Sequence, residues 1–263
     1  MPNRSTMIDW DLAVLAASKL SGPGPDVSRA EAQAAVDELR AGAHRSTPLV
    51  REYTGLVAEE RTAPVLVVDR PGWIQANVDG FATIISPLVE KMREKRGAPS
   101  PLAEAVGSRV TGLELGGLLG FMSSKVLGQF DPFHAPAGSD TAGRLLLVAP
   151  NIVHVESELG VDPSDFRLWV CLHEETHRVQ FTAVPWMRDH IHGEIAALID
   201  SVEVDPAKLA NMLGEGMKRI GDLVRGDDEV SLIDLVESPE QKVVIDLITA
   251  VMSLLAGHSD VDM

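Results

Sequence analysis

The sequence predicts a mainly α-helical fold with a few short strands, on three observations. The 263 residues are 45% hydrophobic and 24% charged, which is enough apolar material for a sizeable core. Apolar residues recur at helical spacing in roughly ten segments. Only two short runs, residues 64–69 and 145–148, favour strands. We expect a single domain over residues 1–263, with residues 1–100 as an N-terminal helical subdomain within it.

Glycine and proline breakers separate the helices of the first half. The run of Gly and Pro at residues 22–25 ends the first helix. Ser28 and Glu31 have the spacing of a capping box, which opens an Ala-rich helix. Basic residues before the Gly-Ala-Pro run at 97–99 close a long helix. The helices expected in this half span residues 7–21, 28–43, 48–60, 73–95 and 101–129.

The segment 101–129 is expected to be one helix although it is rich in glycine. Each interior glycine costs a helix about 0.5–1 kcal/mol relative to alanine. Close packing against another helix explains why glycine is kept there. The glycines concerned are Gly107, Gly112, Gly116, Gly117 and Gly120.

The second half is expected to be helical except for a loop at 129–136 and the strand at 145–148. Asp162 and Pro163 mark the start of its most informative helix, and Pro185 marks the end. The helices expected in this half span residues 154–159, 163–184, 186–202, 206–225, 230–237 and 239–258.

The helix at 163–184 carries a His-Glu-x-x-His motif at residues 173–177. His173 and His177 are four residues apart, so their rings project from one face of the helix and can reach a single tetrahedral zinc ion. Glu174 follows the first histidine and is placed to take a proton from a water molecule beside the metal. The motif therefore points to metal-assisted hydrolysis of an amide.

The two histidines belong to an apolar stripe of this helix, which places them on its inward face. The stripe consists of Phe166, Val170, His173, His177 and Val184. A helix that carries two histidines and no metal is the alternative, and each buried ring would then need a hydrogen-bond partner. Arg178 and Gln180 flank the motif and are expected to make contacts on the helix surface.

A catalytic zinc site needs three protein ligands and one open position for water. The pattern with a third histidine six residues after the second is excluded, because Ala183 occupies that position. The other pattern takes a carboxylate from a later helix, and its candidates are Glu194, Asp200 and Glu203. A solvated helix face explains each of these carboxylates as well. His190 and His192 follow Pro185 and are expected at the surface.

The charge balance disfavours two classes of binding partner. The chain has 23 basic and 39 acidic residues, a formal net charge of −16, which disfavours binding to nucleic acid and to anionic membranes. Cys171 is the one cysteine and is expected to pack inside the fold.

Residues 1–20 lack a signal-peptide layout, and no stretch is apolar enough to span a membrane. We therefore expect a cytoplasmic protein.

Seven separated blocks, read together, carry a family resemblance. They lie at residues 8–11, 125–131, 148–152, 165–170, 173–181, 184–186 and 252–260. These blocks resemble the zincin-like metallopeptidase type 2 family, which is found largely in actinobacteria. The resemblance implies a zincin-like helical metallopeptidase fold and a zinc ion held by His173 and His177. It also implies that Glu174 is the general base and that the substrate is a peptide or protein.

The C-terminal block departs from the family at the expected third ligand. Where the family is expected to have Glu-Gly-His-Ala-Asp, this chain has Ala256 in place of the Glu. Asp260 lies one helical turn beyond Ala256 on the same face, so it is the candidate replacement and the third metal ligand of our prediction. Water in that position, a degenerate site and an engineered change are the alternatives. Family members are also expected to continue beyond the position of Met263.

The sequence thus predicts a zinc-dependent metallopeptidase. The alternative is a non-catalytic binding protein that keeps the zincin scaffold with a degenerate metal site, and Ala256 motivates it. Members of the family are often labelled as associated with deazaflavin-coenzyme biosynthesis. We find no Gly-rich phosphate loop after a strand to support that role, and the acidic balance disfavours an anionic cofactor.

Overall fold

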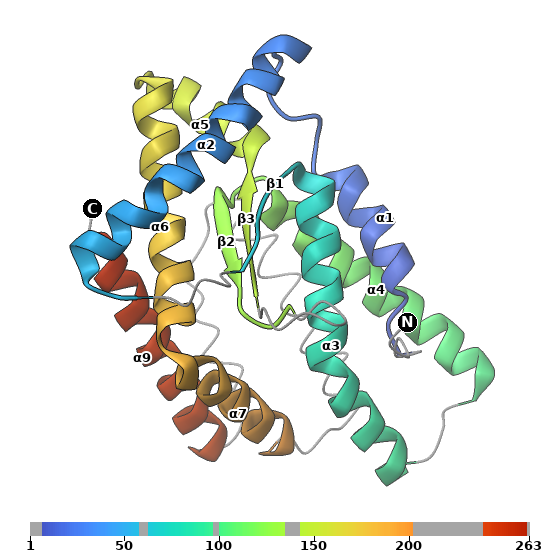
Figure 1. The fold of residues 1–263 in the computed structure, drawn as a ribbon. Coiled ribbons are helices and arrows are strands. Elements are labelled where there is room, and N and C mark those ends of the chain that lie inside the picture. The colour runs from blue at the N-terminus through green and yellow to red at the C-terminus, as the bar shows by residue number, and fades with distance from the viewer. Residues whose placement is uncertain (1–6, 58–62, 97–99, 135–142, 202–238, 262–263) are drawn as a thin grey trace. The chain divides into compact units, whose positions relative to one another are not determined.

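The computed structural model describes residues 7–57, 63–96, 100–134, 143–201 and 239–261 (Figure 1). This part of the chain holds eight helices and three short strands, which confirms the predicted mainly α-helical fold. The elements are α1 (Trp10–Leu20), α2 (Arg29–Thr54), β1 (Val65–Val68), α3 (Arg70–Arg96), α4 (Pro101–Ser123), β2 (Gly128–Asp131), β3 (Arg144–Val148), α5 (Ala149–Leu159), α6 (Pro163–Ala183), α7 (Pro185–Ser201) and α9 (Pro239–Val261). The helices expected at 206–225 and 230–237 lie outside the described residues.

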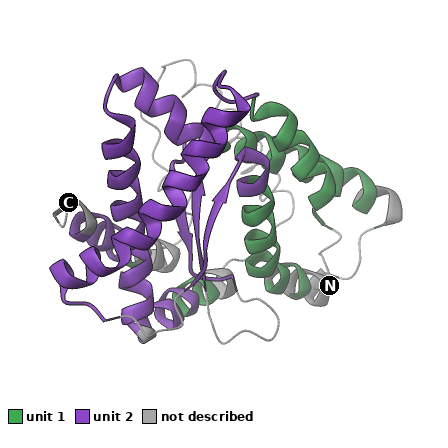
Figure 2. Ribbon diagram, turned by 45° about the horizontal axis from the view of Figure 1, so that its top comes forward, with its two compact units in different colours: residues 1–22, 74–123, 193–248 green, residues 23–73, 124–192, 249–263 purple. Residues whose placement is uncertain are grey.

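The chain divides into two compact units, each assembled from three separate stretches (Figure 2). The first unit takes residues 1–22, 74–123 and 193–248, and the second takes residues 23–73, 124–192 and 249–263. The N-terminal subdomain of residues 1–100 stays a prediction. None of the described helices is both long and apolar enough to cross a membrane.

In the first unit, α1 packs closely against the glycine-rich helix α4. A Cβ added at Gly116 would lie 2.8 Å from the Ala13 carbonyl oxygen, and one at Gly120 would lie 2.8 Å from the Leu20 Cβ. At Gly112 the added atom would lie 2.5 Å from the Asp9 carbonyl oxygen. The predicted reason, close packing against another helix, is confirmed for Gly112, Gly116 and Gly120, whereas a Cβ added at Gly107 would meet nothing within 4 Å.

The second unit is built around a three-stranded sheet in the order β1-β3-β2. β3 pairs in parallel with β1 and antiparallel with β2. Every residue of β3 is buried, as expected for a central strand covered on both faces. β2 is therefore an edge strand, and it packs against α6.

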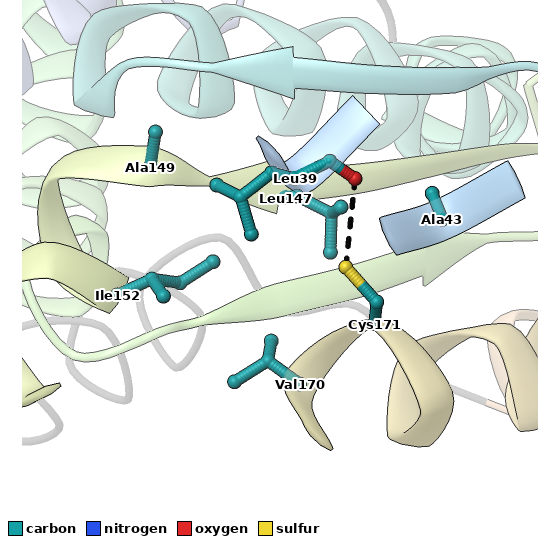
Figure 3. Close-up of a cluster of buried hydrophobic side chains, with 7 residues drawn as sticks. All are labelled: Leu39, Ala43, Leu147, Ala149, Ile152, Val170 and Cys171. Atoms are coloured by element: carbon teal, nitrogen blue, oxygen red, sulfur yellow. Dashed lines mark hydrogen bonds between the residues drawn. The ribbon is translucent and has the colours of Figure 1, made fainter. Parts of the chain in front are cut away.

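The core of the second unit joins α2, β3, α5 and α6 (Figure 3). Cys171 of α6 points at α2, where its thiol lies 3.5 Å from the Leu39 carbonyl oxygen. Burial raises the pKa of the Cys171 thiol to about 12, so it stays protonated and acts as a small apolar side chain. The predicted packing role of Cys171 is confirmed. The cluster consists of Leu39, Ala43, Leu147, Ala149, Ile152, Val170 and Cys171.

Two expectations about local structure are wrong. Residues 29–54 form one helix through Pro48 rather than two, because the buried positions Ala43, Ser46 and Val50 continue the buried face of the helix past the proline. The helix ends at Gly55, whose φ of 69° provides a left-handed cap. Residues 128–131, expected as a helix end and a loop, form β2 instead. Its backbone groups pair with β3, a contact that local sequence does not encode.

Candidate metal site on helix α6

Local capping and proline signals set the bounds of α6. The Asp162 side chain accepts hydrogen bonds from the backbone N–H groups of Ser164 and Asp165, at 2.9 and 3.1 Å. Pro163 occupies the first helical position, where a missing N–H costs nothing. The helix ends at Ala183, two residues before Pro185. The predicted helix at 163–184 is confirmed to within one residue.

The two motif histidines lie side by side on this helix. The ring centroids of His173 and His177 are 5.0 Å apart, and the ring planes are nearly perpendicular at 89°. Both rings are half-buried, at the edge of the buried face rather than at its centre. Trp169, which is 44% exposed, stacks on His173 with ring centroids 5.9 Å apart. The two imidazoles are thus neighbours at a partly accessible place on the helix.

The Glu174 carboxylate is buried against the backbone of β2. The residue is 7% exposed, and burial raises the pKa of its carboxyl group to about 8. A Cβ added at Gly128 would lie 2.5 Å from the Glu174 Cδ and 2.6 Å from its Oε1. Glycine in a strand often marks such a close approach. Gly128 therefore leaves the room that the Glu174 carboxylate occupies, and it is a site residue that motif spacing did not reveal.

Arg178 and Gln180 are buried, so the expectation that they make helix-surface contacts is wrong. They are 6% and 3% exposed. Arg178 forms two hydrogen bonds of 2.7 Å with the carboxylate of Glu175, which is fully buried. It also donates to the Ala63 carbonyl oxygen at 2.6 Å and to the Thr47 hydroxyl at 3.0 Å. The second glutamate of the motif is thus part of the scaffold.

The N-terminal half of α6 is fixed by Arg167. Its guanidinium donates to Glu156 of α5 at 2.9 Å and to Glu38 of α2 at 2.6 Å. Hydrogen bonds from the Ser164 hydroxyl and from Arg167 hold the pKa of the Glu38 carboxyl below its usual value. Arg167 therefore ties the N-terminal half of α6 to α2 and α5, while Arg178 ties the C-terminal half to Thr47 and Ala63.

Helix α9 meets α6 one turn after the second histidine. Gln180 lies three residues beyond His177, and its side chain contacts the Leu255 carbonyl oxygen at 3.1 Å and the His258 ring at 3.0 Å. Residue 256 therefore lies in the turn of α9 that contacts the motif helix. This is where the family resemblance expects a glutamate ligand and where this chain has Ala256.

Of the four predicted site residues, His173 and His177 lie together, with ring centroids 5.0 Å apart, and Glu174 lies in the same turn of α6; their roles stay predictions. Asp260 lies in the last turn of α9, but its side chain is outside the described part, so its role stays a prediction. Among the side chains that the structure describes, no three His, Cys, Asp or Glu residues gather closely enough to hold a metal ion. Two neighbouring imidazoles fit the nitrogen donors that zinc takes and would fill two of its four positions.

The roles of the other candidate ligands stay predictions. Glu194 lies in α7, in the first unit. The side chain of Asp200 and all of Glu203 are outside the described part. His190 and His192 are exposed, as predicted, and their rings lie near Trp186 and Phe133, at centroid distances of 6.0 and 6.2 Å.

Comparison with known proteins gives one family and one solved structure. A family model described as zincin-like metallopeptidase matches residues 8–263. A crystal structure from Chloroflexus aurantiacus, described provisionally as a hydrolase with a novel fold, is 29% identical with a TM-score of 0.65. The match covers 96% of this chain and 67% of that chain. No curated protein sequence matches this chain.

Proposed function

This chain belongs to the zincin-like metallopeptidase family, and from this premise we propose that it is a zinc-dependent peptidase that hydrolyses peptide bonds with an activated water molecule. One observation carries the proposal. His173 and His177 lie 5.0 Å apart on α6, and the carboxylate of Glu174 comes from the same helix turn. The proposed reaction needs a carboxylate next to the metal ligands, and Glu174 directly follows His173.

Each residue of the motif has a separate task in this reaction. His173 and His177 hold the metal through ring nitrogens, which requires both rings to be neutral. A zinc ion held there would supply a Lewis acid, which would polarise a carbonyl group and make a water molecule a better proton donor near neutral pH. Glu174 takes that proton and delivers it to the leaving amine as the new C–O bond forms and the C–N bond breaks. Arg178 and Glu175 keep the helix in place and do not touch the reacting atoms.

Replacement of Glu174 by glutamine tests the proposal. Turnover of a mixture of unstructured peptides is measured with added zinc for the unmodified chain, Glu174→Gln and His173→Ala. We expect Glu174→Gln to lose about 10²–10⁴-fold in rate while it still binds zinc, because glutamine keeps the shape but cannot carry the proton. His173→Ala should lose both zinc and turnover. Hydrolysis by Glu174→Gln at the rate of the unmodified chain would contradict the proposal.

A second candidate function is a binding protein that keeps the scaffold without catalysis. Ala256 favours it, because a methyl group cannot ligate zinc and lies where the resemblance expects the third ligand. This alternative predicts capture of a peptide or protein partner in fixed stoichiometry without turnover. Steady turnover that depends on Glu174 rules it out.

A further inference from the structure

The buried side chain of Gln180 connects the second motif histidine to helix α9. Its Oε1 lies 3.0 Å from Nδ1 of His177. Its Nε2 lies 3.1 Å from the Leu255 carbonyl oxygen and 3.0 Å from Nδ1 of His258. One amide group, 3% exposed, therefore holds three partners from two helices that are far apart in the sequence.

The Leu255 carbonyl fixes which way this amide points. A carbonyl oxygen can only accept a hydrogen bond, so the group that faces it must be the NH₂ of Gln180. The amide oxygen then faces His177, and because that oxygen can only accept, Nδ1 of His177 must carry the proton. The second N–H of the same NH₂ is left to donate to Nδ1 of His258. The backbone of α9 thus determines the tautomer of a ring on α6.

We propose that Gln180 is a positioning residue, which holds His177 in the tautomer that binds metal and couples this tautomer to the docking of α9. A neutral ring protonated at Nδ1 has its lone pair on Nε2, and a metal ligand needs that lone pair. The proposal rests on the proposed function, since it assigns His177 as a ligand. Its structural part is independent of catalysis and can be tested without metal or substrate.

The coupling has a direct consequence for the turn of α9 that contains residue 256. Because Leu255 and His258 flank Ala256, the amide of Gln180 fixes this turn beside the motif helix. A ligand from α9 would reach the site only while this contact is made. Gln180 therefore organises the second ligand and the region of the third ligand through one side chain.

The experiment is an NMR measurement of the ring nitrogens in the full chain without metal. Histidine is labelled with ¹⁵N, the pH is held near 8 so that the rings are neutral, and the His177 signals are identified by their loss in His177→Ala. We expect His177 to be protonated at Nδ1 in the unmodified chain. In Gln180→Leu the acceptor is gone, and the Nδ1-protonated population should fall.

Two further variants separate positioning from a merely structural role. Gln180→Glu keeps an acceptor for His177 but loses the donors to α9, so we expect the Nδ1-protonated form to remain. His258→Ala removes one acceptor and leaves the Leu255 carbonyl, so the tautomer should also remain. Zinc affinity should fall about 10–100-fold in Gln180→Leu and less in Gln180→Glu.

The outcomes distinguish this inference from the proposed function. His177 protonated at Nε2 in the unmodified chain, or Nδ1 protonation that persists in Gln180→Leu, overturns the role of Gln180. If each variant shows the tautomer expected for it but the unmodified chain does not hydrolyse peptides, only the peptidase proposal is contradicted. The spectrum of the unmodified chain decides the first point even where a variant fails to fold.

Discussion

Glu174 and Gly128 show how one residue makes room for another at the site. The Glu174 carboxylate lies against the edge strand β2, where a Cβ on residue 128 would come within 2.5 Å of its Cδ. Helix α6 and strand β2 pack against each other here, so an added methyl group would have to displace the buried Glu174 side chain. The carboxylate is thus largely buried against the strand.

Gly128→Ala is expected to destabilise the protein by about 1–3 kcal/mol, because it overpacks this contact. Chemical denaturation of the unmodified chain, Gly128→Ala, Glu174→Ala and the double variant measures the effect. The cost of Gly128→Ala should shrink once Glu174→Ala has removed the carboxylate. Equal costs in both backgrounds would show that the two residues do not interact.

The burial of Glu174 also predicts a pH dependence of stability in the metal-free protein. Burial raises the pKa of Glu174 to about 8, above the 4.5 of an exposed glutamate. The folded state then binds more protons than the unfolded state between these values, so the contribution of Glu174 to stability is lost as the pH rises through them. The Glu174→Gln variant should not show this loss of stability.

The melting temperature of Glu174→Gln minus that of the unmodified chain should therefore increase as the pH rises from 5 to about 8. Thermal unfolding in buffers with a metal chelator measures both proteins in parallel. A difference that does not change with pH would contradict the raised pKa.

At the scale of elements, buried charge pairs hold α6 in place. Arg178 is 6% exposed and pairs with the fully buried Glu175, and it also contacts Thr47 of α2. Removal of one partner leaves a buried charge without compensation, which typically costs 3–5 kcal/mol. An exposed pair, by contrast, contributes little.

Arg178→Ala is accordingly expected to destabilise the protein by about 3–5 kcal/mol. The matched control is Arg40→Ala, which breaks the exposed Arg40–Asp37 pair of 3.5 Å on α2 and should change stability by less than about 0.5 kcal/mol. Urea unfolding compares the two variants. Similar small effects from both would mean that the Arg178 pair is not an anchor of α6.

The helix pair α1 and α4 offers a second test of packing. Gly116 faces α1, with 2.8 Å between an added Cβ and the Ala13 carbonyl oxygen, while an added Cβ at Gly107 meets nothing within 4 Å. Gly107→Ala should stabilise the protein by about 0.5–1 kcal/mol through helix propensity. Gly116→Ala should destabilise it. A gain from both substitutions, measured by thermal unfolding, would contradict the close packing.

Sequence predicted those elements whose signals are local. The cap at Asp162, the motif and Pro185 lie within α6 or beside it, and the helix was placed to within one residue. β2 was missed, because a four-residue strand is defined by its pairing with β3 rather than by its own composition. Pro48 was read as a break, but burial of α2 on both sides of it overrode the local preference.

At the scale of the whole molecule, the candidate site is assembled from distant parts of the chain. The motif supplies His173, Glu174 and His177, which sequence identified because one helix carries all three. The sequence alone did not identify Gly128 and Gln180, because their contacts are with Glu174 on α6 and with α9. Gln180 lies 75 residues from its partner Leu255. In our proposal, a third ligand from α9 would depend on the same contact between α6 and α9.

The central proposal is that His173 and His177 hold a zinc ion, and that the turn of α9 with residue 256 is the place from which a third ligand would come. Zinc affinity, measured by competition with a chelator, tests it in the unmodified chain, His173→Ala and Ala256→Glu. We predict one zinc per chain, loss of binding in His173→Ala, and affinity at least about tenfold higher in Ala256→Glu, a gain of about 1.4 kcal/mol. Binding that persists in His173→Ala, or affinity that Ala256→Glu leaves unchanged, would contradict the account.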